Sequence, residues 1–527
     1  MHSIGTELVR ALADHNIDTV FGIPGVHTVE LYRGLAGSGI RHVTPRHEQS
    51  AGFMADGYAR VSGRPGVAFV ITGPGLTNTL TAMAQARADS VPMLVVSGVN
   101  RLDTLGKGLG YLHELPNQRA LAEQVALHSV RVTEASMLRP ALNRALTSVE
   151  RPGPWHVEIP LDVAGQAYAI DAKSDADMRQ QSLPDPRADD LNRAATLLRA
   201  AQHPVILAGG GVRYAGAQVL ALAEMLDAPV VQTINARGLL HSHPLGVPAS
   251  PSLEAVRALI SGSDAVLAVG TELGPTDFDM YATGTMPRMQ NLIRIDICQQ
   301  QLARRDCDVA IQGEGAAVLE RLLNGLDASR NDGTGTARAA LARQQAIEEI
   351  GPEMRAMCDL LNAAQQVVPG AVMVGDSAQP IYAGNLYYDH DRAGGWFNAA
   401  TGFGALGYAI PAAIGAALAA PDERILCLTG DGGAQFSLPE LMTAKDEGVD
   451  VTFVIWNNHG YQEIETSMEA VGVSPVGCDP TPPDFEAVAA SCGLPFYSCP
   501  ANRSDFTQAL KSATAQRGPS VVEIRAS

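Results

Sequence analysis

Two polar residues follow neighbouring apolar segments in a pattern that favours metal and phosphate binding. Asp431 comes soon after the apolar run 425–428, and Asn458 comes soon after the run 451–456. The runs predict two buried parallel strands joined by a helix, so their carboxyl ends meet at one edge of a sheet. A carboxylate, an amide oxygen and a backbone carbonyl near Gly460 are ligands that suit Mg²⁺, and diphosphate oxygens would complete its octahedron.

The glycine-rich turn around Asp431 suits phosphate as well as metal. Glycines let backbone N–H groups approach phosphate oxygens, and the helix after the turn adds its positive end. Alone, GDG is usually a strand-to-helix turn and NN usually a loop. Together, with strand-helix-strand between them, they resemble the diphosphate and Mg²⁺ motif of thiamine-diphosphate enzymes. The resemblance implies cofactor contacts from Gly430, Asp431, Gly432, Gly433, Ala434, Asn458, Gly460 and Tyr461, and metal ligation by Asp431, Asn458 and Gly460.

The composition is that of an α/β protein with several domains. A chain of 527 residues is too long for one core, and about three domains of ordinary size are expected. The net charge of −18 argues against general binding to nucleic acid or anionic membranes. No apolar run has membrane length, the N-terminus has no signal-peptide core, and seven scattered cysteines favour reduced thiols. We therefore expect a cytoplasmic protein.

The first third of the chain predicts another parallel sheet with polar residues at its strand ends. Short apolar strands alternate with helices. Glu48 falls at a strand end or in the first turn of a helix, and the glycine turn 72–75 follows the next strand. Taken alone, a glutamate in a first helical turn is most simply a favourable charge near the positive end of the helix.

The succession GIPG, RHEQSAGFMADGYAR and ITGPGLTN resembles the pyrimidine-binding domain of the acetolactate synthase and 2-oxo acid decarboxylase group. With GDGGA and NNHGY, the resemblance covers nearly the whole chain. It implies that Glu48 hydrogen-bonds N1′ of the aminopyrimidine and promotes proton removal by the 4′-imino group. It also implies a cofactor contact from Gly73. His27 and His113 are candidates for later proton transfers, on their loop positions alone.

The resemblance extends to the last third of the chain. The segment GFGALG resembles a family turn in which Leu406 would be the wedge between the two cofactor rings and the Gly404 carbonyl would receive the 4′-amino group. Holding two reacting atoms at contact distance supplies much of a rate enhancement. Asp376 and Ser377 follow the strand expected at 372–375, and in relatives this turn lies close to the diphosphate.

Two segments are expected to line a substrate pocket. Relatives carry a substrate loop near residues 110–118 and a pocket-lining helix after the metal loop. The resulting candidates are Glu114, Gln118, Glu463 and Ile464. If the two glutamates face inward, they would suit a cationic substrate tail; otherwise they are solvated surface residues.

The middle third predicts a third parallel-sheet domain. Its Gly209–Gly211 turn lacks the GxGxxG spacing and ribose-binding acid of a dinucleotide site. In acetolactate synthases the equivalent domain holds FAD, but the segment 244–251 departs from their GMHG-like sequence, which puts FAD in doubt. The expected division is a pyrimidine-binding domain 1–165, a linker 166–186, a central domain 187–326, a linker 327–350 and a diphosphate- and Mg²⁺-binding domain 351–527.

These motifs predict three doubly wound parallel-sheet α/β domains and a thiamine-diphosphate enzyme acting on a 2-oxo acid. FGIPGVHTVELYRGL, IRHVTPRHEQSAGFMADGYAR and YLHELPNQ look most like the 5-guanidino-2-oxopentanoate (2-ketoarginine) decarboxylases, which implies release of an aldehyde and CO₂. The alternatives are an acetolactate synthase or other carboligase, and a non-catalytic cofactor-binding scaffold. Because this family builds each site between two subunits, a homodimer or a dimer of dimers (homotetramer) is implied.

Overall fold

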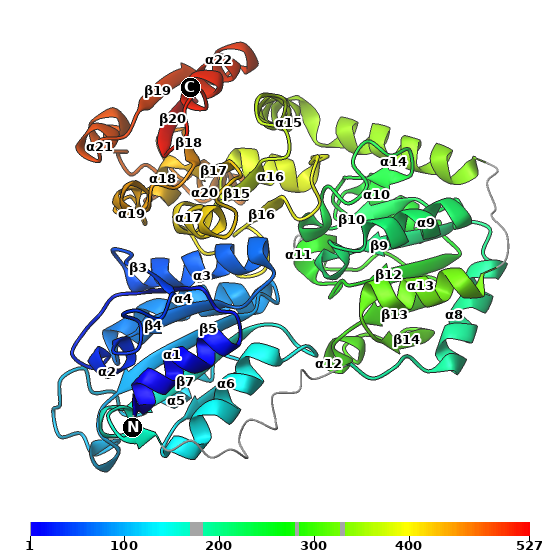
Figure 1. The fold of residues 1–527 in the computed structure, drawn as a ribbon. Helices are drawn as coiled ribbons and strands as arrows, with labels where there is room; N and C mark the ends of the chain where they lie inside the picture. The colour runs from blue at the N-terminus through cyan, green and yellow to red at the C-terminus, as the bar shows by residue number, and fades with distance from the viewer. Residues whose placement is uncertain (1, 169–182, 280–283, 327–332, 527) are drawn as a thin grey trace.

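The structure is a computed structural model that describes residues 2–168, 183–279, 284–326 and 333–526. In the described part of the chain, the strands form three six-stranded sheets and one two-stranded pair. All pairings within the six-stranded sheets are parallel, and helices cover both faces of each sheet (Figure 1). The prediction of three doubly wound parallel-sheet domains is confirmed.

The first domain, drawn in blue and cyan in Figure 1, has the strand order β3-β2-β4-β5-β7-β6. Its strands are β2 (Thr19–Gly22), β3 (Arg41–Val43), β4 (Gly66–Val70), β5 (Met93–Val99), β6 (His128–Arg131) and β7 (Pro154–Pro160). Its helices are α1 (Ile4–Asp14), α2 (Val29–Tyr32), α3 (Glu48–Ser62), α4 (Pro74–Ala88), α5 (Gln118–Ala122), α6 (Leu138–Thr147) and α7 (Leu161–Ala164). The pair β1 (His2–Ser3) and β8 (Ala167–Tyr168) ties its two ends together.

The central domain, in green, has the order β11-β10-β9-β12-β13-β14. Its strands are β9 (Pro204–Ala208), β10 (Val230–Gln232), β11 (Gly246–Val247), β12 (Ala265–Val269), β13 (Leu292–Asp296) and β14 (Val309–Gln312). Its helices are α8 (Ala188–Ala200), α9 (Gly216–Leu226), α10 (Glu254–Ser261), α11 (Pro275–Phe278), α12 (Gln299–Leu302) and α13 (Gly315–Gly325).

The last domain, yellow to red, has the order β16-β15-β17-β18-β20-β19. Its strands are β15 (Val372–Gly375), β16 (Trp396–Asn398), β17 (Ile425–Gly430), β18 (Val451–Asn457), β19 (Phe496–Pro500) and β20 (Ser520–Arg525). Its helices are α15 (Gly351–Val367), α16 (Gln379–Leu386), α17 (Ala409–Ala419), α18 (Asp431–Ala434), α19 (Glu440–Glu447), α20 (Gln462–Ala470), α21 (Phe485–Ser491) and α22 (Arg503–Ala513). Helix α19 ends at Gly448, in the left-handed conformation that glycine favours.

The two predicted linkers lie partly outside the described residues, which omit 169–182 and 327–332. Residues Thr334–Glu349 of the second predicted linker form helix α14, which packs against α10 of the central domain. None of the helices in the described ranges is long and apolar enough to cross a membrane.

Helices α3 and α17 join the first and last domains (Figure 1). Each contributes a glycine at the crossing: a Cβ on Gly57 would lie 2.0 Å from the Ala412 carbonyl oxygen, and one on Gly415 would lie 1.9 Å from that of Met54. Only glycine allows backbones to approach so closely. Helix α3 begins at Glu48, so this contact also fixes the element that carries the predicted catalytic carboxylate.

Candidate active site

Four strands of the first sheet end at the same edge, and each leads to a predicted site residue. His27 follows β2, Glu48 follows β3, Gly73 follows β4 and His113 follows β5. The rings of His27 and His113 lie edge to face with centroids 5.4 Å apart. A Cβ on Gly73 would lie 2.7 Å from the His113 carbonyl oxygen. The carboxyl ends of the strands thus gather both histidines against the glycine turn, as an open parallel sheet predicts.

Glu48 is held by a residue that the sequence did not single out. Asn78 on α4 donates a hydrogen bond from Nδ2 to Glu48 Oε2 at 3.0 Å, and the half-buried carboxylate is thereby oriented. Asn78 stands at the end of the ITGPGLTN motif, just over one helical turn beyond Gly73. This position in the motif is the sequence signal that could have identified Asn78. It points to Glu48 only once the structure places α3 beside α4.

The hydrogen bonds of His27 fix its tautomer. Asn100 donates from Nδ2 to the Leu112 carbonyl, so its Oδ1 is the atom that faces His27 Nε2 at 3.0 Å. Burial lowers the pKa of His27; the Asn100 bond opposes this and the nearby His113 adds to it. A neutral ring that donates from Nε2 has a bare Nδ1, and this buried atom has no partner among the described residues. His27 can therefore accept a proton.

Gln118, a substrate candidate, is buried within the first domain with its amide fully bonded. Its Oε1 accepts from the Thr72 hydroxyl at 2.7 Å and from the Gly73 N–H at 3.1 Å. Its Nε2 donates at 3.1 Å each to Ser97 Oγ, the Gly98 carbonyl and Glu158 Oε2. The side chain supports the Gly73 turn from behind.

Glu114 and Glu463, the two carboxylate candidates, differ in what they face. Glu114 accepts N–H groups of its own loop, from Leu109, Gly110 and Tyr111, at 3.3, 2.7 and 3.0 Å. Desolvation opposes these bonds, but together they lower the pKa of Glu114. Glu463 is half-buried on α20, close enough to Tyr382 that its charge adds to burial in raising that phenol's pKa.

Tyr382 itself bonds with Ser377 in the turn after β15. Ile464, the next residue, is 53% exposed. Of the two carboxylate candidates, Glu463 is the one whose charge acts on a residue of the last domain.

The last sheet repeats the arrangement of the first. Asp376 and Ser377 follow β15, the turn with Gly404 and Leu406 follows β16, Asp431 follows β17 and Asn458 follows β18. Gly404 is exposed with φ +72°, and a Cβ there would meet nothing within 4 Å. Leu406 is half-buried beside it. The turn therefore offers an open backbone next to an apolar side chain.

The Asp376 carboxylate holds the turn that contains Gly404 and Leu406. Its Oδ1 accepts the Ser377 N–H and its Oδ2 the Gly407 N–H, both at 2.8 Å. Burial raises the pKa of Asp376 to about 6, while the N–H groups around it act in the opposite direction. Any cofactor contact at this position would come from the backbone around Asp376, because its carboxylate is committed to the two turns.

Three oxygen atoms converge at the ends of β17 and β18. Asn458 Oδ1 lies 3.0 Å from Asp431 Oδ1 and 3.0 Å from the Gly460 carbonyl oxygen. Asn458 Nδ2 points the other way and donates to the side-chain oxygens of Gln379 and Gln462, both at 3.2 Å. Asp431 Oδ2 is buried without a partner among the described residues, and burial raises the pKa of this carboxyl. With the Asn458 amide turned this way the three oxygens suit a cation, whereas the reversed amide would donate from Nδ2 to Asp431 Oδ1 and to the Gly460 carbonyl oxygen.

The donor set suits Mg²⁺. In the described ranges no three His, Cys, Asp or Glu side chains cluster as metal ligands. One carboxylate with two neutral oxygens leaves octahedral positions for phosphate oxygens and water, as is usual for Mg²⁺. The neighbouring glycines are closely packed: a Cβ on Gly432 would lie 2.4 Å from the Tyr461 ring, and one on Gly433 3.2 Å from Asp376 Oδ2. Gly430 and the buried Ala434 complete the turn.

The side-chain hydrogen bonds of the main site residues at the two edges stay within their own domains. The side-chain bond of Glu48 stays in the first domain, and those of Asp431 and Asn458 stay in the last. Each edge carries half of the predicted machinery.

The central sheet has a glycine turn at the same place, but it is filled. A Cβ on Gly209 would lie 2.1 Å from the Gly270 carbonyl oxygen, and one on Gly211 2.8 Å from Gly270 Cα. This packing between the turns after β9 and β12 accounts for glycine at both positions.

Three models of thiamine pyrophosphate enzymes match the chain in succession. The N-terminal TPP binding domain matches residues 2–121, the central domain residues 191–322 and the C-terminal TPP binding domain residues 376–524.

Curated relatives match the chain over most of its length. The probable 2-ketoarginine decarboxylase AruI of Pseudomonas aeruginosa is 41% identical, over 99% of this chain and 93% of that protein. The acetolactate synthase isozyme 1 large subunit of Escherichia coli is 29% identical, over 98% and 93%. The acetolactate synthase large subunit of Corynebacterium glutamicum is 32% identical, over 86% and 74%. Matched along all three domains, and 41% identical to a whole-length relative, the chain belongs to the thiamine pyrophosphate enzyme family.

Proposed function

We propose that the protein decarboxylates a 2-oxo acid to an aldehyde and CO₂, using thiamine diphosphate held by Mg²⁺, and that the substrate is 5-guanidino-2-oxopentanoate. The convergence of Asp431, Asn458 and Gly460 oxygens carries the proposal, because it fits a diphosphate-bound cation at the strand ends. The whole-chain similarity to a probable 2-ketoarginine decarboxylase supports the substrate.

The protein's share of the chemistry is binding, orientation and proton transfer. When bound, thiamine diphosphate supplies the electron sink for decarboxylation. Asp431, Asn458 and the Gly460 carbonyl would hold the metal, while Glu48, oriented by Asn78, would accept a hydrogen bond from the pyrimidine ring and exchange a proton with it. Leu406 and the Gly404 carbonyl would lie against the cofactor and orient it.

Proton delivery to the product falls to the histidine pair. His27 is neutral with a bare Nδ1, and His113 lies against its ring. A neutral imidazole in a buried site can accept and return a proton during a reaction cycle.

Glu463 is the residue that we propose binds a cationic substrate tail. A guanidinium forms paired, charge-assisted hydrogen bonds with a carboxylate. The Glu463 charge acts on Tyr382 of the last domain, whereas the Glu114 carboxylate is occupied by its own loop. We assign recognition of the guanidinium to Glu463.

A complete site requires two copies of the chain. One copy supplies the edge with Glu48 and the other the edge with Asp431, so the protein acts as a homodimer or as a dimer of dimers. We place it in the cytoplasm, in keeping with the seven unpaired cysteines among the described residues.

The test is CO₂ release with product analysis from 2-ketoarginine, pyruvate and benzoylformate, with thiamine diphosphate and Mg²⁺ but no added FAD. We expect preference for 2-ketoarginine and an aldehyde product. Preference for pyruvate, with acetolactate as product and a flavin absorbance in the purified protein, would make the chain an acetolactate synthase. Failure to release CO₂ from any of the three would contradict the proposal.

A further inference from the structure

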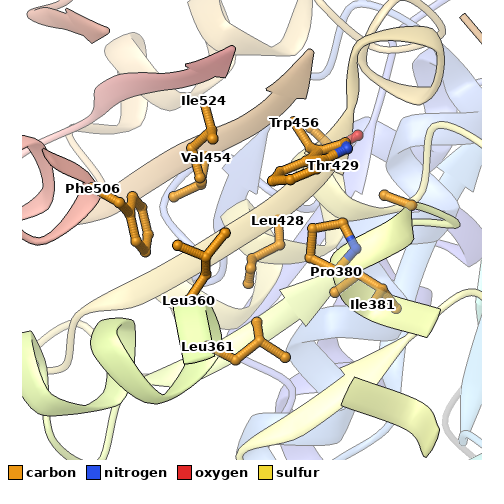
Figure 2. A pocket seen from close by; sticks show the side chains of 11 residues that line it. Leu360, Leu361, Pro380, Ile381, Leu428, Thr429, Val454, Trp456, Phe506 and Ile524 are labelled. Carbon is orange, nitrogen blue, oxygen red and sulfur yellow. The ribbon is translucent and has the colours of Figure 1, made fainter. Parts of the chain in front are cut away.

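The side chain of Trp456 is fixed at the carboxyl end of β18. In the sheet register it stands beside Gly430 on one side and Ile524 on the other. Its ring is 7% exposed and lines an apolar cavity of about 20 Å³, beside Thr429 and Pro380 (Figure 2). In so small an apolar space the ring has little room to move. Its N–H is the only polar group of the ring and needs a hydrogen-bond acceptor.

The Trp456 N–H determines how the Gln379 amide is turned. Trp456 Nε1 donates to Gln379 Oε1 at 3.0 Å. Indole nitrogen is only a donor, so the atom of Gln379 that faces it must be the oxygen. Gln379 opens α16 and is 8% exposed, which leaves its side chain little freedom to turn.

The Gln379 oxygen in turn determines how the Asn458 amide is turned. The same Oε1 accepts from Asn458 Nδ2 at 3.2 Å, so the Asn458 oxygen faces Asp431 and Gly460. With the amide reversed, Asn458 Nδ2 would donate to Asp431 Oδ1 and to the Gly460 carbonyl, each at 3.0 Å. That arrangement satisfies the local oxygens without a metal, but it sets the Asn458 oxygen against the Gln379 oxygen.

We propose that Trp456 and Gln379 are positioning residues that keep the Asn458 amide oxygen turned toward a divalent cation. The inference rests on the proposed function, since it concerns the metal site assigned there. We call this pair the relay, because Trp456 orients Gln379 and Gln379 orients Asn458. The relay disfavours the reversed Asn458 amide, which bonds its neighbours without a metal, so the three oxygens remain available to a cation. Partners that orient metal ligands in this way typically change metal affinity by about 10- to 100-fold when removed.

The experiment measures Mn²⁺ binding by electron paramagnetic resonance, with thiamine diphosphate saturating. Gln379→Leu removes the acceptor and should weaken Mn²⁺ binding by about 10- to 100-fold. Gln379→Glu keeps an acceptor that cannot donate, so its affinity should stay within about threefold of wild type. A direct bond from Gln379 to the diphosphate would give the opposite order, because the glutamate would repel the phosphates.

Trp456→Phe frees the Gln379 amide to turn and should weaken Mn²⁺ binding less than Gln379→Leu does. Since both residues act through one amide, the double variant should bind Mn²⁺ no more weakly than Gln379→Leu alone. The matched control is Trp396→Phe, which removes another buried indole bond in the same domain, from Trp396 Nε1 to Asn385 Oδ1 at 3.1 Å. It should lose stability without losing Mn²⁺ affinity.

The outcomes separate the relay from the function. Wild-type Mn²⁺ binding that Gln379→Leu leaves unchanged, or additive losses in the double variant, would overturn the relay alone. Wild-type protein that binds no Mn²⁺ with thiamine diphosphate would overturn the proposed metal site and the relay together.

Discussion

The central and last domains share one architecture but end their strands differently. Both are six-stranded parallel sheets with a glycine turn at a carboxyl end. In the central domain the turn is filled by backbone, with Gly209 and Gly211 packed on Gly270. In the last domain the turn presents Asp431 to Asn458 and the Gly460 carbonyl. This difference shows that the side chains at the strand ends, rather than the sheet or its glycines, make the site.

The largest effect on activity is expected from loss of the charged metal ligand, Asp431. Asp431→Asn removes the single charged oxygen of the set and should reduce decarboxylation and Mg²⁺-dependent cofactor binding by on the order of 10³-fold. The matched change is Asp296→Asn, at the end of β13 in the central sheet, where Oδ1 accepts the Cys298 N–H at 2.8 Å. It should leave cofactor binding unchanged. Equal losses in the two variants, measured by calorimetry, would end the contrast between the domains.

Glu48→Gln tests the half-site in the first domain. It keeps the hydrogen-bonding shape but removes the acid, so kcat should fall by about 10²- to 10⁴-fold while thiamine diphosphate still binds. Steady-state assays with calorimetry of cofactor binding check both parts. An unchanged kcat would remove Glu48 from the chemistry.

Glu463→Gln should cost preference for the cationic substrate. We expect kcat/KM for 2-ketoarginine to fall by about 10- to 50-fold, because a charge-assisted pair becomes a neutral contact. Turnover of an uncharged 2-oxo acid should change little. Glu465→Gln, on the exposed face of the same helix, is the control. The assignment fails if both variants, or neither, lose activity toward 2-ketoarginine.

Paired glycine changes compare the two turns directly. Gly209→Ala and Gly432→Ala each bring a Cβ within 2.1 and 2.4 Å of a neighbour, and each should destabilise the fold by about 1–3 kcal/mol. Gly432→Ala should also weaken cofactor binding by about tenfold, because the displaced neighbour is Tyr461 in the metal loop. Thermal unfolding and cofactor titration of both variants give the comparison. If Gly432→Ala bound the cofactor as tightly as Gly209→Ala does, neither turn would serve the cofactor.

The smallest effect is a pH dependence of stability. Burial raises the pKa of Asp376 from 3.8 to about 6, so the folded protein keeps this proton at pH values where the unfolded chain has lost it. The resulting stability is full below pH 3.8 and is lost as pH rises through 6. From about pH 5 to about pH 7, the unfolding free energy of wild type relative to Asp376→Asn should fall by about 1 kcal/mol. Urea titrations at several pH values measure it, and a constant difference would be inconsistent with the raised pKa.

The sequence predicts this molecule well where a residue's position is set by its own strand. Asp431 and Asn458 directly follow their strands, and Glu48 begins the helix after β3, because apolar runs and turns are local signals. Side-chain direction is not local. Gln118, which was expected to line the substrate pocket, lies in a buried set of hydrogen bonds, whose other members come from β5, β7 and the turn at Thr72 and Gly73.

Asn78 and Gln379 were not predicted for the same reason. Each acts on a residue more than one element away, Glu48 and Asn458 respectively, and the contact exists only after the domains fold. A hydrogen bond between distant segments leaves no period or spacing in the sequence.

The most direct test of the two half-sites is a crystal structure of the protein with thiamine diphosphate and Mn²⁺, with the metal located by its anomalous scattering. We predict one peak among Asp431 Oδ1, Asn458 Oδ1 and the Gly460 carbonyl oxygen, with the pyrimidine ring against Glu48 of a second copy of the chain. A metal located elsewhere, or a pyrimidine ring bound by Glu48 of the same chain, would contradict the account.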